Sequence, residues 1–478
     1  MYIGIDLGST NIKAALYDSE FTLVSRLSRP VEYIRDGGVV EFDAAVYCED
    51  LVALLKQLVN DAKEPVRQLA FTGQAESLVV VGKDGKPMMN AISWMDERSA
   101  EQCKVLEKQF PPEVVRSVTG QQAVLPTWPA TKILWLKENR PEIYEGAETF
   151  MLLKDYVVYY LTGKKLADMS IATFSLYFDI YKKCYWRQML SAIGIDEGRL
   201  PPLAEPCSVA GKLLPELGLG DGIVNIGTLD HFAGMIGTGN CTPGGITLST
   251  GTVMALSVMA ETVNRESEIA VHYGFLPDTY VLLPVAESGG VSLEWFRRTC
   301  MEGVDYGKLN EVLEAREGKD ELLFLPYLVG VSAPEFDSDA TGVFWGLRQE
   351  HDKFHMARAV MEGVSFMLRK NCEALDRSGT TCRAIMATGG GAKSPTWCQM
   401  QADITGLSVN VPKEQEAACL GAAMIAGVSD GRFADYAEAA KHCVSMAACY
   451  APQKSEFLEK KYQKFCALYK AALEIARM

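Results

Sequence analysis

Asp6 and the turn Gly8-Ser9-Thr10 are the first residues of the chain whose types and spacing could do chemistry. Small residues in a turn let backbone N–H groups point together into an anion site, and the two hydroxyls add hydrogen-bond donors. A carboxylate just before such a turn suits a hard cation that bridges phosphate oxygens. The pattern predicts a turn that binds a magnesium nucleotide. On these residues alone, an ordinary N-terminal β-hairpin with a Gly-Ser turn is the alternative.

A second acidic residue, Asp230, interrupts an apolar and glycine-rich run from Ile223 to Gly239. A carboxylate at the end of a buried strand is costly unless it binds something. Asp230 is therefore a candidate general base or metal ligand. His231 beside it is either a second polar contact or a half-buried histidine with a satisfied hydrogen bond.

Three glycines, Gly389-Gly390-Gly391, end a strand that begins near Ile385 and precede a helix expected over 394–404. Backbone without side chains can lie flat against a ligand, so this pattern indicates a nucleotide surface. It lacks the Lys-Ser/Thr spacing of a Walker A motif and the spacing of a dinucleotide fingerprint.

Gln74 and Glu76 follow a strand expected over residues 67–73. Because substrates usually bind at the carboxyl ends of strands in α/β sheets, both side chains are candidates for contacts with substrate hydroxyls. A solvated turn is the alternative interpretation.

Trp94, Asp96 and Arg98 offer an apolar face, a hydroxyl acceptor and a donor within five residues of sequence. This is chemistry suited to holding a sugar or polyol. A buried tryptophan beside a surface ion pair would give the same pattern.

Strand and helix periodicity indicates which elements position these residues. Apolar residues alternate with small or polar ones over residues 2–7 and resume at Ile12, which predicts strand, turn, strand. Segment 245–259 repeats the arrangement around Ser249-Thr250-Gly251-Thr252, about half a chain away. The repeat suggests an internal duplication, in which two similar domains each offer a phosphate turn to one nucleotide. Further periodic segments predict a strand over 23–30 and helices over 44–62, 128–139, 291–300, 417–428 and from residue 455 onward.

The length and composition of the chain bound its class. At 478 residues the chain is too long for one core, and 48% hydrophobic with 23% charged residues is ordinary for a globular protein. The formal charge of −14 argues against nucleic acid or an anionic membrane as partner, because both require a basic surface. The 13 cysteines include no Cys-x-x-Cys pair, and core strand periodicity begins at residue 2, so we expect reduced thiols and a cytoplasmic location.

Taken together, the motifs of this sequence resemble the FGGY family of carbohydrate kinases over nearly the whole chain. In chain order they are IGIDLGSTNIKAALYD, GQAES, WMDERS, TWPATKILWLKEN, KDY with DMS, GTLDHFAGMIG, LSTGT, FLPYLVG, GVFWGL with HMARAVMEG, and TGGGAKSPTWCQMQAD. The segment 342–362 fits the family's second signature at each defined position. The first signature is met from Pro129 to Asn139, whereas Thr127 departs from it.

The resemblance implies an α/β fold of two actin-like, ribonuclease H-like domains, as in the actin, hexokinase and Hsp70 group, with a central cleft that closes on the sugar. We expect residues 1–239 to form the N-terminal domain, with the sugar-binding residues and the catalytic aspartate. Residues 240–478 would form the C-terminal domain, with the glycines that contact adenosine.

The resemblance also implies roles for individual residues. Asp230 would be the catalytic base, and Asp6 with Asp230 would help to hold Mg²⁺. ATP would be bound by Gly8, Ser9, Thr10, Lys13, Ser249, Thr250, Gly251, Thr252, Gly389, Gly390, Gly391, Ala392 and Ser394, with Glu416 to Ala418 nearby. The substrate would be contacted by Gln74, Ala75, Glu76, Trp94, Asp96, Arg98, Asp230 and His231.

The substrate implied by the resemblance is a small ketose, with a pentulose such as xylulose or ribulose first. Three segments depart from the pattern of xylulokinases, which commonly have Met-His at Ala75-Glu76, Asp-Asn at Asp230-His231 and Gly-Glu-Arg-Thr-Pro at Gly330-Val331-Ser332-Ala333-Pro334. Glu76 is instead similar to a carboxylate that takes substrate hydroxyls in glycerol kinases. A polyol, tetrulose or hexulose is therefore the alternative substrate, and the resemblance leaves a homodimer open.

Two rival functions share the same fold. One is an ATPase without sugar transfer, and the other is a sugar-sensing relative that has lost catalysis. The candidate substrate residues argue against the first, and retention of Asp6, Asp230 and both phosphate turns argues against the second.

Overall fold

The computed structural model describes residues 1–286, 288–316, 319–331, 333–335, 337–414 and 416–478. Contacts divide the chain into two units. The first comprises Met1–Cys241, Ala270–Val281 and Glu416–Val444, and the second Thr242–Ile269, Leu282–Gln415 and Ser445–Met478.

A six-stranded sheet organises the first unit, in the order β14-β15-β6-β1-β2-β3. Strand β1 (Tyr2–Leu7) pairs antiparallel with β2 (Asn11–Tyr17) and parallel with β6 (Gln68–Gly73), which in turn pairs parallel with β15 (Ile223–Leu229). Leu7 and Leu229 both pair with Gly73. The carboxyl ends of these three parallel strands therefore meet at one edge of the sheet.

The first unit has a second sheet in the order β4-β5-β8-β7-β9 and a set of helices around both sheets. The remaining strands of the six-stranded sheet are β3 (Leu23–Pro30) and β14 (Val209–Lys212), and those of the second sheet are β4 (Ile34–Asp36), β5 (Val39–Phe42), β7 (Leu78–Val81), β8 (Ala91–Ile92) and β9 (Thr149–Leu152). Short pairs join β10 (Ala167–Asp168) to β13 (Leu203–Ala204) and β11 (Phe178–Asp179) to β12 (Cys184–Tyr185). The helices are α1 (Ala44–Asp61), α2 (Ala100–Gln109), α3 (Pro112–Thr119), α4 (Pro129–Asn139), α5 (Pro141–Gly146), α6 (Leu153–Thr162), α7 (Met169–Ala172), α8 (Arg187–Ile193), α9 (Asp230–Gly237), α14 (Ala417–Ser429) and α15 (Tyr436–Cys443).

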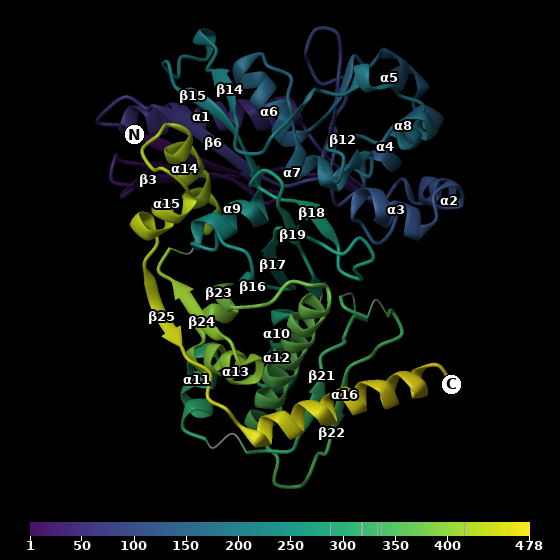
Figure 1. The fold of residues 1–478 in the computed structure, drawn as a ribbon, viewed down its shortest axis with the longest axis vertical. Helices are drawn as coiled ribbons and strands as arrows, with labels where there is room; N and C mark the ends of the chain where they lie inside the picture. Colours follow the sequence, from purple (N-terminus) through teal and green to yellow (C-terminus); the bar gives the residue numbers. More distant parts are fainter. Residues whose placement is uncertain (287, 317–318, 332, 336, 415) are drawn as a thin grey trace. The chain divides into compact units, whose positions relative to one another are not determined.

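Helix α14 comes late in the chain but packs within the first unit, where Figure 1 shows it in yellow among the purple and teal elements. It packs against β1 and α9. The approach is so close that a Cβ on Gly237 would lie 1.8 Å from the Ala417 carbonyl oxygen, and one on Gly421 would lie 1.9 Å from that of Ala233. Glycine at both positions lets the two helix backbones touch. This contact places Glu416, which precedes α14, beside β2.

The second unit repeats the strand order of the first. Its sheet runs β17-β16-β23-β24-β25, with β16 (Gly245–Thr250) antiparallel to β17 (Met254–Ala260) and parallel to β23 (Ala384–Gly389), which is parallel to β24 (Ser408–Pro412). Thr250 pairs with Gly389 as Leu7 pairs with Gly73. The predicted duplication of the strand-turn-strand unit is therefore present in the fold.

The other elements of the second unit cover this sheet or extend from it. They are β20 (Val285–Ala286), β21 (Leu323–Leu325), β22 (Val343–Trp345), β25 (Met446–Tyr450), α10 (Gly290–Cys300), α11 (Tyr306–Glu314), α12 (Lys353–Arg377), α13 (Pro395–Thr405) and α16 (Glu456–Ala476). Strands β18 (Val271–Tyr273) and β19 (Tyr280–Leu282) follow β17 in the chain, and all of their residues except Leu282 belong to the first unit. Asp352 caps α12 by accepting hydrogen bonds from the backbone N–H groups of Phe354 and His355.

The predicted α/β fold is confirmed, and the predicted helices and strands lie within a few residues of their expected bounds. The division into residues 1–239 and 240–478 stays a prediction. Contacts place its boundary near Cys241 and group two later segments, 270–281 and 416–444, with the first unit.

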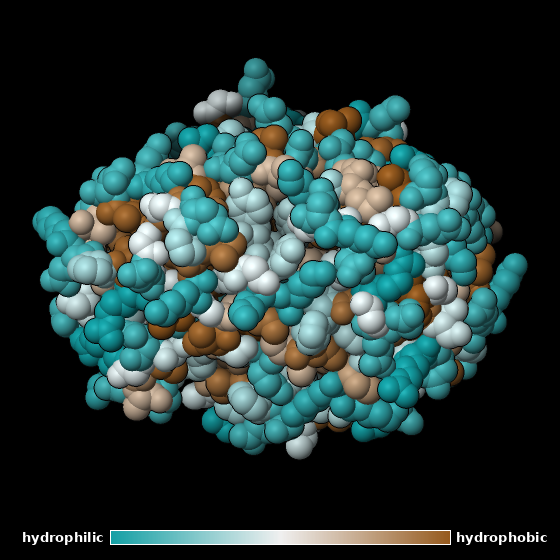
Figure 2. Space-filling model, turned by 90° about the horizontal axis from the view of Figure 1, so that it is seen from above, coloured by the Kyte–Doolittle hydropathy of each residue, from teal (hydrophilic) through white to brown (hydrophobic). Residues whose placement is uncertain are grey.

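The surface is mostly hydrophilic on the face that Figure 2 shows. Figure 2 shows hydrophilic residues over most of the visible face, with hydrophobic ones scattered among them, and scattered apolar residues are usual on a protein surface. Among the described residues, no helix is both long enough and apolar enough to cross a membrane.

Candidate functional site

Two predicted carboxylates, Asp6 and Asp230, lie at the carboxyl edge of the first unit's sheet. Asp6 is near the end of β1, and Asp230 follows β15 directly as the first residue of α9. Burial, and after it the negative charge of Asp230, raises the pKa of Asp6 to about 7. The structure therefore brings together two acidic groups that repel each other, an arrangement that a cation between them would relieve.

The backbone orients Asp230 at the start of α9. Its Oδ1 accepts a hydrogen bond from the backbone N–H of His231 at 2.6 Å. Asp230 and His231 are both half-buried, so solvent or a small substrate can reach them.

The turn Gly8-Ser9-Thr10 joins β1 to β2, and hydrogen bonds from two buried side chains support it. The carbonyl oxygen of Gly8 accepts hydrogen bonds from the hydroxyl of Tyr47 at 3.2 Å and from Nε2 of Gln74 at 3.4 Å. Gln74 is buried, and its Oε1 accepts a hydrogen bond from the Ser77 hydroxyl at 2.8 Å. Gln74, predicted to contact substrate, thus supports the predicted phosphate turn.

Lys13 on β2 lies opposite Asp6 in the hairpin register. Its Nζ forms an ion pair with Glu416 at 2.7 Å, and each side chain is 32% exposed. Burial lowers the pKa of Lys13, but the hydrogen bond that Lys13 donates to Glu416 and the charges of Glu416 and Asp6 outweigh it and raise that pKa overall. Lys13, which is predicted to contact phosphate, is therefore held at the acidic edge by Glu416, a residue distant from it in sequence.

The carboxylates at this edge can hold Mg²⁺ only if a bound ligand supplies further oxygen atoms. In the part of the chain that the structure describes, no group of three or more His, Cys, Asp or Glu residues could hold a metal ion. Mg²⁺ is commonly held by one or two carboxylates together with substrate phosphates and water. Asp6 and Asp230 meet that requirement, and Asp6 in particular has a carboxyl that gains from a nearby cation.

The backbone of Glu76 is held by a buried lysine, Lys132, which was not among the predicted site residues. Nζ of the fully buried Lys132, on α4, donates hydrogen bonds to the carbonyl oxygens of Glu76 at 3.0 Å and Ser93 at 2.8 Å. Burial lowers the pKa of Lys132 to about 7 and raises the pKa of Glu76, although the charges of the two groups oppose these shifts. Glu76 has a positive φ of 66°, which is uncommon for a residue other than glycine. Lys132 lies within the signature segment that starts at Pro129, so its motif was visible while its contact with Glu76 was not.

Asp96 and Arg98, both predicted to contact substrate, bind each other in the structure. Asp96 is fully buried, and its Oδ2 accepts a hydrogen bond from the Val40 backbone N–H at 2.6 Å while both of its oxygens bind the Arg98 guanidinium. Arg98 also pairs with Glu41 at 2.7 Å. Asp96 therefore fixes its own loop, and its contact with a substrate stays a prediction. Trp94, 39% exposed, remains available as an apolar face beside half-buried Ala75 and Glu76.

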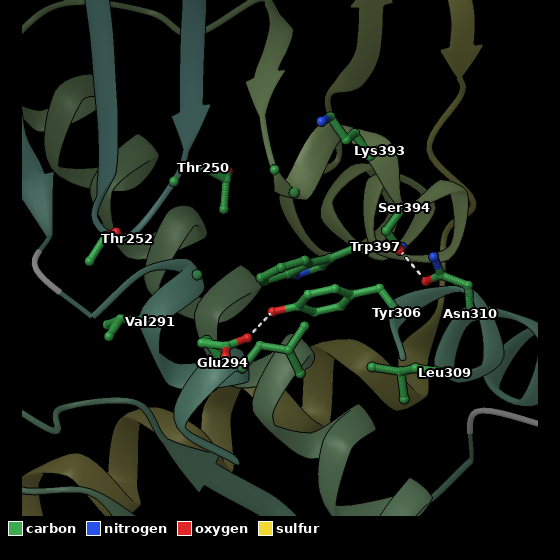
Figure 3. A pocket seen from close by; sticks show the side chains of 15 residues that line it. Thr250, Thr252, Val291, Glu294, Tyr306, Leu309, Asn310, Lys393, Ser394 and Trp397 are labelled. Atoms are coloured by element: carbon green, nitrogen blue, oxygen red, sulfur yellow. Dashed lines mark hydrogen bonds between the residues drawn. The ribbon is translucent and has the colours of Figure 1, made fainter. Parts of the chain in front are cut away.

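A cavity of about 430 Å³ in the second unit is the other candidate site (Figure 3). It is lined by Thr250, Gly251, Thr252, Gly290, Val291, Leu293, Glu294, Tyr306, Leu309, Asn310, Gly390, Gly391, Lys393, Ser394 and Trp397. Six of the predicted nucleotide residues are among these, namely Thr250, Gly251, Thr252, Gly390, Gly391 and Ser394. Ser249, Gly389 and Ala392 do not line the cavity and lie in the strand ends and turn that form it.

Helices α10, α11 and α13 supply the walls that the sequence analysis missed. Figure 3 shows the rings of Tyr306 and Trp397 inside the cavity, with the Glu294 carboxylate near the Tyr306 hydroxyl. That hydroxyl donates to Glu294 at 2.5 Å, and the Ser394 hydroxyl donates to Oδ1 of Asn310 at 2.6 Å. Cavities of this size with aromatic walls and a few oriented polar groups are typical of sites for small organic ligands. A flat, largely apolar group such as a nucleobase fits this chemistry.

The glycine-rich floor of the cavity depends on direct backbone contacts. The Gly251 carbonyl accepts a hydrogen bond from the Gly290 N–H at 2.8 Å, and the Thr252 carbonyl accepts one from the Val291 N–H at 3.0 Å. These bonds tie the turn between β16 and β17 to the start of α10. The turn predicted to bind phosphate is therefore one wall of the cavity.

Known proteins are similar to this chain over nearly its full length. Residues 1–237 match the N-terminal domain, and residues 246–429 the C-terminal domain, of the FGGY family of carbohydrate kinases. A xylulose kinase of Bacillus subtilis (strain 168) is 31% identical, over 98% of this chain and 95% of that protein.

Two solved structures have the same fold throughout. The gluconate kinase from Lactobacillus acidophilus superposes with a TM-score of 0.90 at 26% identity, covering 99% of this chain and 98% of that one. The ligand-bound xylulose kinase from the same organism gives 0.89 at 26% identity, covering 100% and 97%. Proteins named for different sugar substrates are thus equally similar to this chain in structure.

Proposed function

Because this chain belongs to the FGGY family of carbohydrate kinases, we propose that it transfers the γ-phosphate of ATP to a hydroxyl of a small ketose, with a pentulose such as xylulose or ribulose as first candidate. The chain is a carbohydrate kinase, and ATP is the phosphate donor of its family. The observation that carries the proposal is the pair Asp6 and Asp230 at one edge of the first unit's sheet.

In this proposal Asp230 is the general base. Its Oδ1 is held by the His231 N–H, so the carboxylate keeps one orientation toward an incoming hydroxyl. Asp230 accepts the proton of that hydroxyl while the sugar oxygen forms its bond to the γ-phosphorus and ADP leaves with the electrons of the broken P–O bond.

Asp6 and Asp230 are the residues that would hold Mg²⁺, which when bound neutralises charge on the phosphate oxygens. Lys13 and the turn Gly8-Ser9-Thr10 would add a cation and donors for the terminal phosphates. The cavity of the second unit would take the adenine base between Tyr306 and the glycines, with the Ser249–Thr252 turn toward the phosphates. The role of each of these residues is part of the proposal.

Glu76 supports an alternative substrate. A half-buried carboxylate can accept hydrogen bonds from two hydroxyls of a polyol, and Trp94 offers a face for its carbon chain. A glycerol-like polyol, a tetrulose or a hexulose is therefore the second candidate. The similarity to both a gluconate kinase and a xylulose kinase leaves the substrate class to experiment.

The test is an ADP-release assay with ATP and Mg²⁺ against tetruloses, pentuloses, hexuloses, aldoses, aldonates and polyols, run beside Asp230→Ala. We expect one strong substrate and its loss in the variant. ADP release without sugar would support the ATPase rival, and no release with any acceptor would support the sensor rival. Either result would overturn the proposal.

The homodimer and the cytoplasmic location remain predictions. Sedimentation velocity of the purified chain, with and without ATP, measures the oligomeric state directly.

A further inference from the structure

Strand β15 contains an irregularity just before Asp230. Its pairing with β6 shifts register between Asn225 and Thr228. Gly227 in this bulge has a φ of 66°, and a Cβ there would lie 1.5 Å from the Phe71 carbonyl oxygen, so only glycine fits. Bulges of this kind bend a strand and re-aim the residues that follow it. The direction in which Asp230 leaves the sheet therefore depends on how the bulge is held.

A buried lysine holds the bulge from α6. Nζ of Lys154 donates a hydrogen bond to the Ile226 carbonyl oxygen at 2.5 Å. Lys154 also forms an ion pair with Asp168 at 2.9 Å, and both side chains are 0% exposed. A buried charged pair of this kind contributes little net stability over apolar residues of similar size. Its position against an irregular strand indicates a role in geometry.

Ser170 connects this pair to the residue that precedes Asp230. Its hydroxyl donates to the Asp168 carboxylate, at 2.8 Å to Oδ1 and 2.9 Å to Oδ2. Its oxygen accepts hydrogen bonds from the Leu229 backbone N–H at 3.2 Å and from the Thr228 hydroxyl at 2.9 Å. One hydroxyl can donate once and accept twice, so Ser170 is fully used.

We propose that Lys154, Asp168 and Ser170 form a positioning network that fixes the bulge and the end of β15, and through them the place of the Asp230 carboxylate. This inference rests on the proposed function of Asp230 as base. The three residues are buried and are offered as positioning residues that act through Asp230. A catalytic base must lie within hydrogen-bond distance of the proton it takes, and a displacement of about 1 Å can cost roughly 100-fold in rate. The network supplies the rigidity that this requires.

The first test compares Ser170→Ala with Ser175→Ala. Both serines are fully buried, and Ser175 accepts a hydrogen bond from the Tyr177 N–H without touching the network. We expect Ser170→Ala to lower kcat by about 10- to 100-fold, with KM values for ATP and sugar changed by less than about threefold. Ser175→Ala should retain near-normal kcat. Equal kcat values for the two variants would overturn the inference.

The second test separates positioning from general damage. In an Asp230→Ala background, Ser170→Ala should lower the residual turnover no further, because the group that it positions is gone. A further loss of the same size in that background would show that Ser170 does not act through Asp230. Thr228→Val, which removes one hydrogen bond to Ser170 at nearly constant volume, is the second variant if Ser170→Ala does not fold. It should lower kcat in the native background alone, and a loss in both backgrounds would count against the network.

The two hypotheses fail differently. Normal turnover in Asp230→Ala would remove the proposed base. A large loss in Asp230→Ala together with native turnover in Ser170→Ala and Thr228→Val would retain the base and remove the positioning network.

Discussion

The first and second units arrange their sheets in the same way but use the carboxyl edges differently. In each, a hairpin pairs with a parallel strand that ends in glycine, Gly73 in the first and Gly389 in the second. The first edge then carries Asp6, Asp230 and the Lys13–Glu416 pair. The second carries a cavity with aromatic and glycine walls. One framework thus supports a charged edge in one unit and a largely apolar pocket in the other.

The difference shows what each edge is suited to do. Charged groups held close together lower the stability of the fold. Their presence therefore indicates that they contact a reacting group or an ion. An apolar cavity binds a flat ring without any such cost. We therefore expect changes at the first edge to alter turnover and pH dependence, and changes in the second unit's cavity to alter nucleotide affinity alone.

The largest expected effect is at Asp230. Asp230→Asn keeps the shape of the side chain but removes the proton acceptor, so kcat should fall by about 100- to 10,000-fold. ATP affinity, measured by calorimetry without Mg²⁺, should remain within about twofold of native because the cavity is untouched. A variant with near-normal kcat, or one that loses ATP binding in parallel, would break the division between the two edges.

The second effect is at Gly390, which lines the cavity. Its backbone is α-helical, with φ −62° and ψ −40°, and an added Cβ would meet only the Thr250 carbonyl oxygen at 3.7 Å. Gly390→Val should therefore fold normally and fill the cavity, raising the KM for ATP by roughly 10- to 100-fold, which is about 1.4 to 2.8 kcal/mol of binding. The KM for the sugar should stay within about twofold.

Gly390→Ala is the graded control for this change, because its smaller side chain fills less of the cavity and should have a smaller effect. If Gly390→Val raised both KM values equally, the cavity would not be a site for the nucleotide alone.

Much of both edges could be predicted from the sequence because the signals are local. Strand periodicity and small residues mark the hairpins at residues 2–17 and 245–259, and Gly389-Gly390-Gly391 marks a segment of which Gly390 and Gly391 line the cavity. Asp230 stands out as a lone acid in an apolar run. These features depend on neighbours in sequence, which a single chain displays directly.

The parts of the fold and of the site that could not be predicted depend on contacts between segments distant in sequence. Tyr306 and Trp397 reach the cavity from helices whose sequences read as ordinary amphipathic ones. Helix α14 packs within the first unit through glycine contacts that no linear division of the chain indicates. Asp96 has the residue type of a sugar ligand, but its burial against Val40 and Arg98 follows only from tertiary structure.

A third prediction concerns Glu76 at the first edge. If its carboxylate accepts hydrogen bonds from the sugar, Glu76→Gln should raise the sugar KM by roughly 10-fold, since a hydrogen bond to a charged group is worth about 1.5 to 3 kcal/mol. The KM for ATP should not change by more than about twofold. Glu97→Gln, at an exposed carboxylate of the nearby Trp94–Arg98 loop, is the matched control and should behave as native. Equal effects on both substrates would remove Glu76 from the sugar site.

The smallest expected effect is on stability, and it has the opposite sign to the effect on function. The pKa of Asp6 is raised from an ordinary value of 3.8 to about 7, chiefly by burial and then by Asp230. Between these pH values the folded chain keeps a proton that the unfolded chain has released. The free energy of unfolding of the ligand-free protein therefore falls as pH rises across this window, and the loss is complete above pH 7.

Asp6→Asn removes this loss because an amide does not ionise. At pH 8, without nucleotide or divalent cations, the variant should unfold several degrees higher than the native protein, since each pKa unit is worth about 1.4 kcal/mol and a chain longer than about 250 residues gains less than about 4 °C per kcal/mol. At pH 4 the two proteins should unfold together. Asp221→Asn, at an exposed aspartate, should change neither value. If Asp6→Asn were no more stable than native at pH 8, the buried Asp6 carboxylate would carry no cost in stability, and the contrast of the first edge with the cavity of the second unit would rest on shape alone.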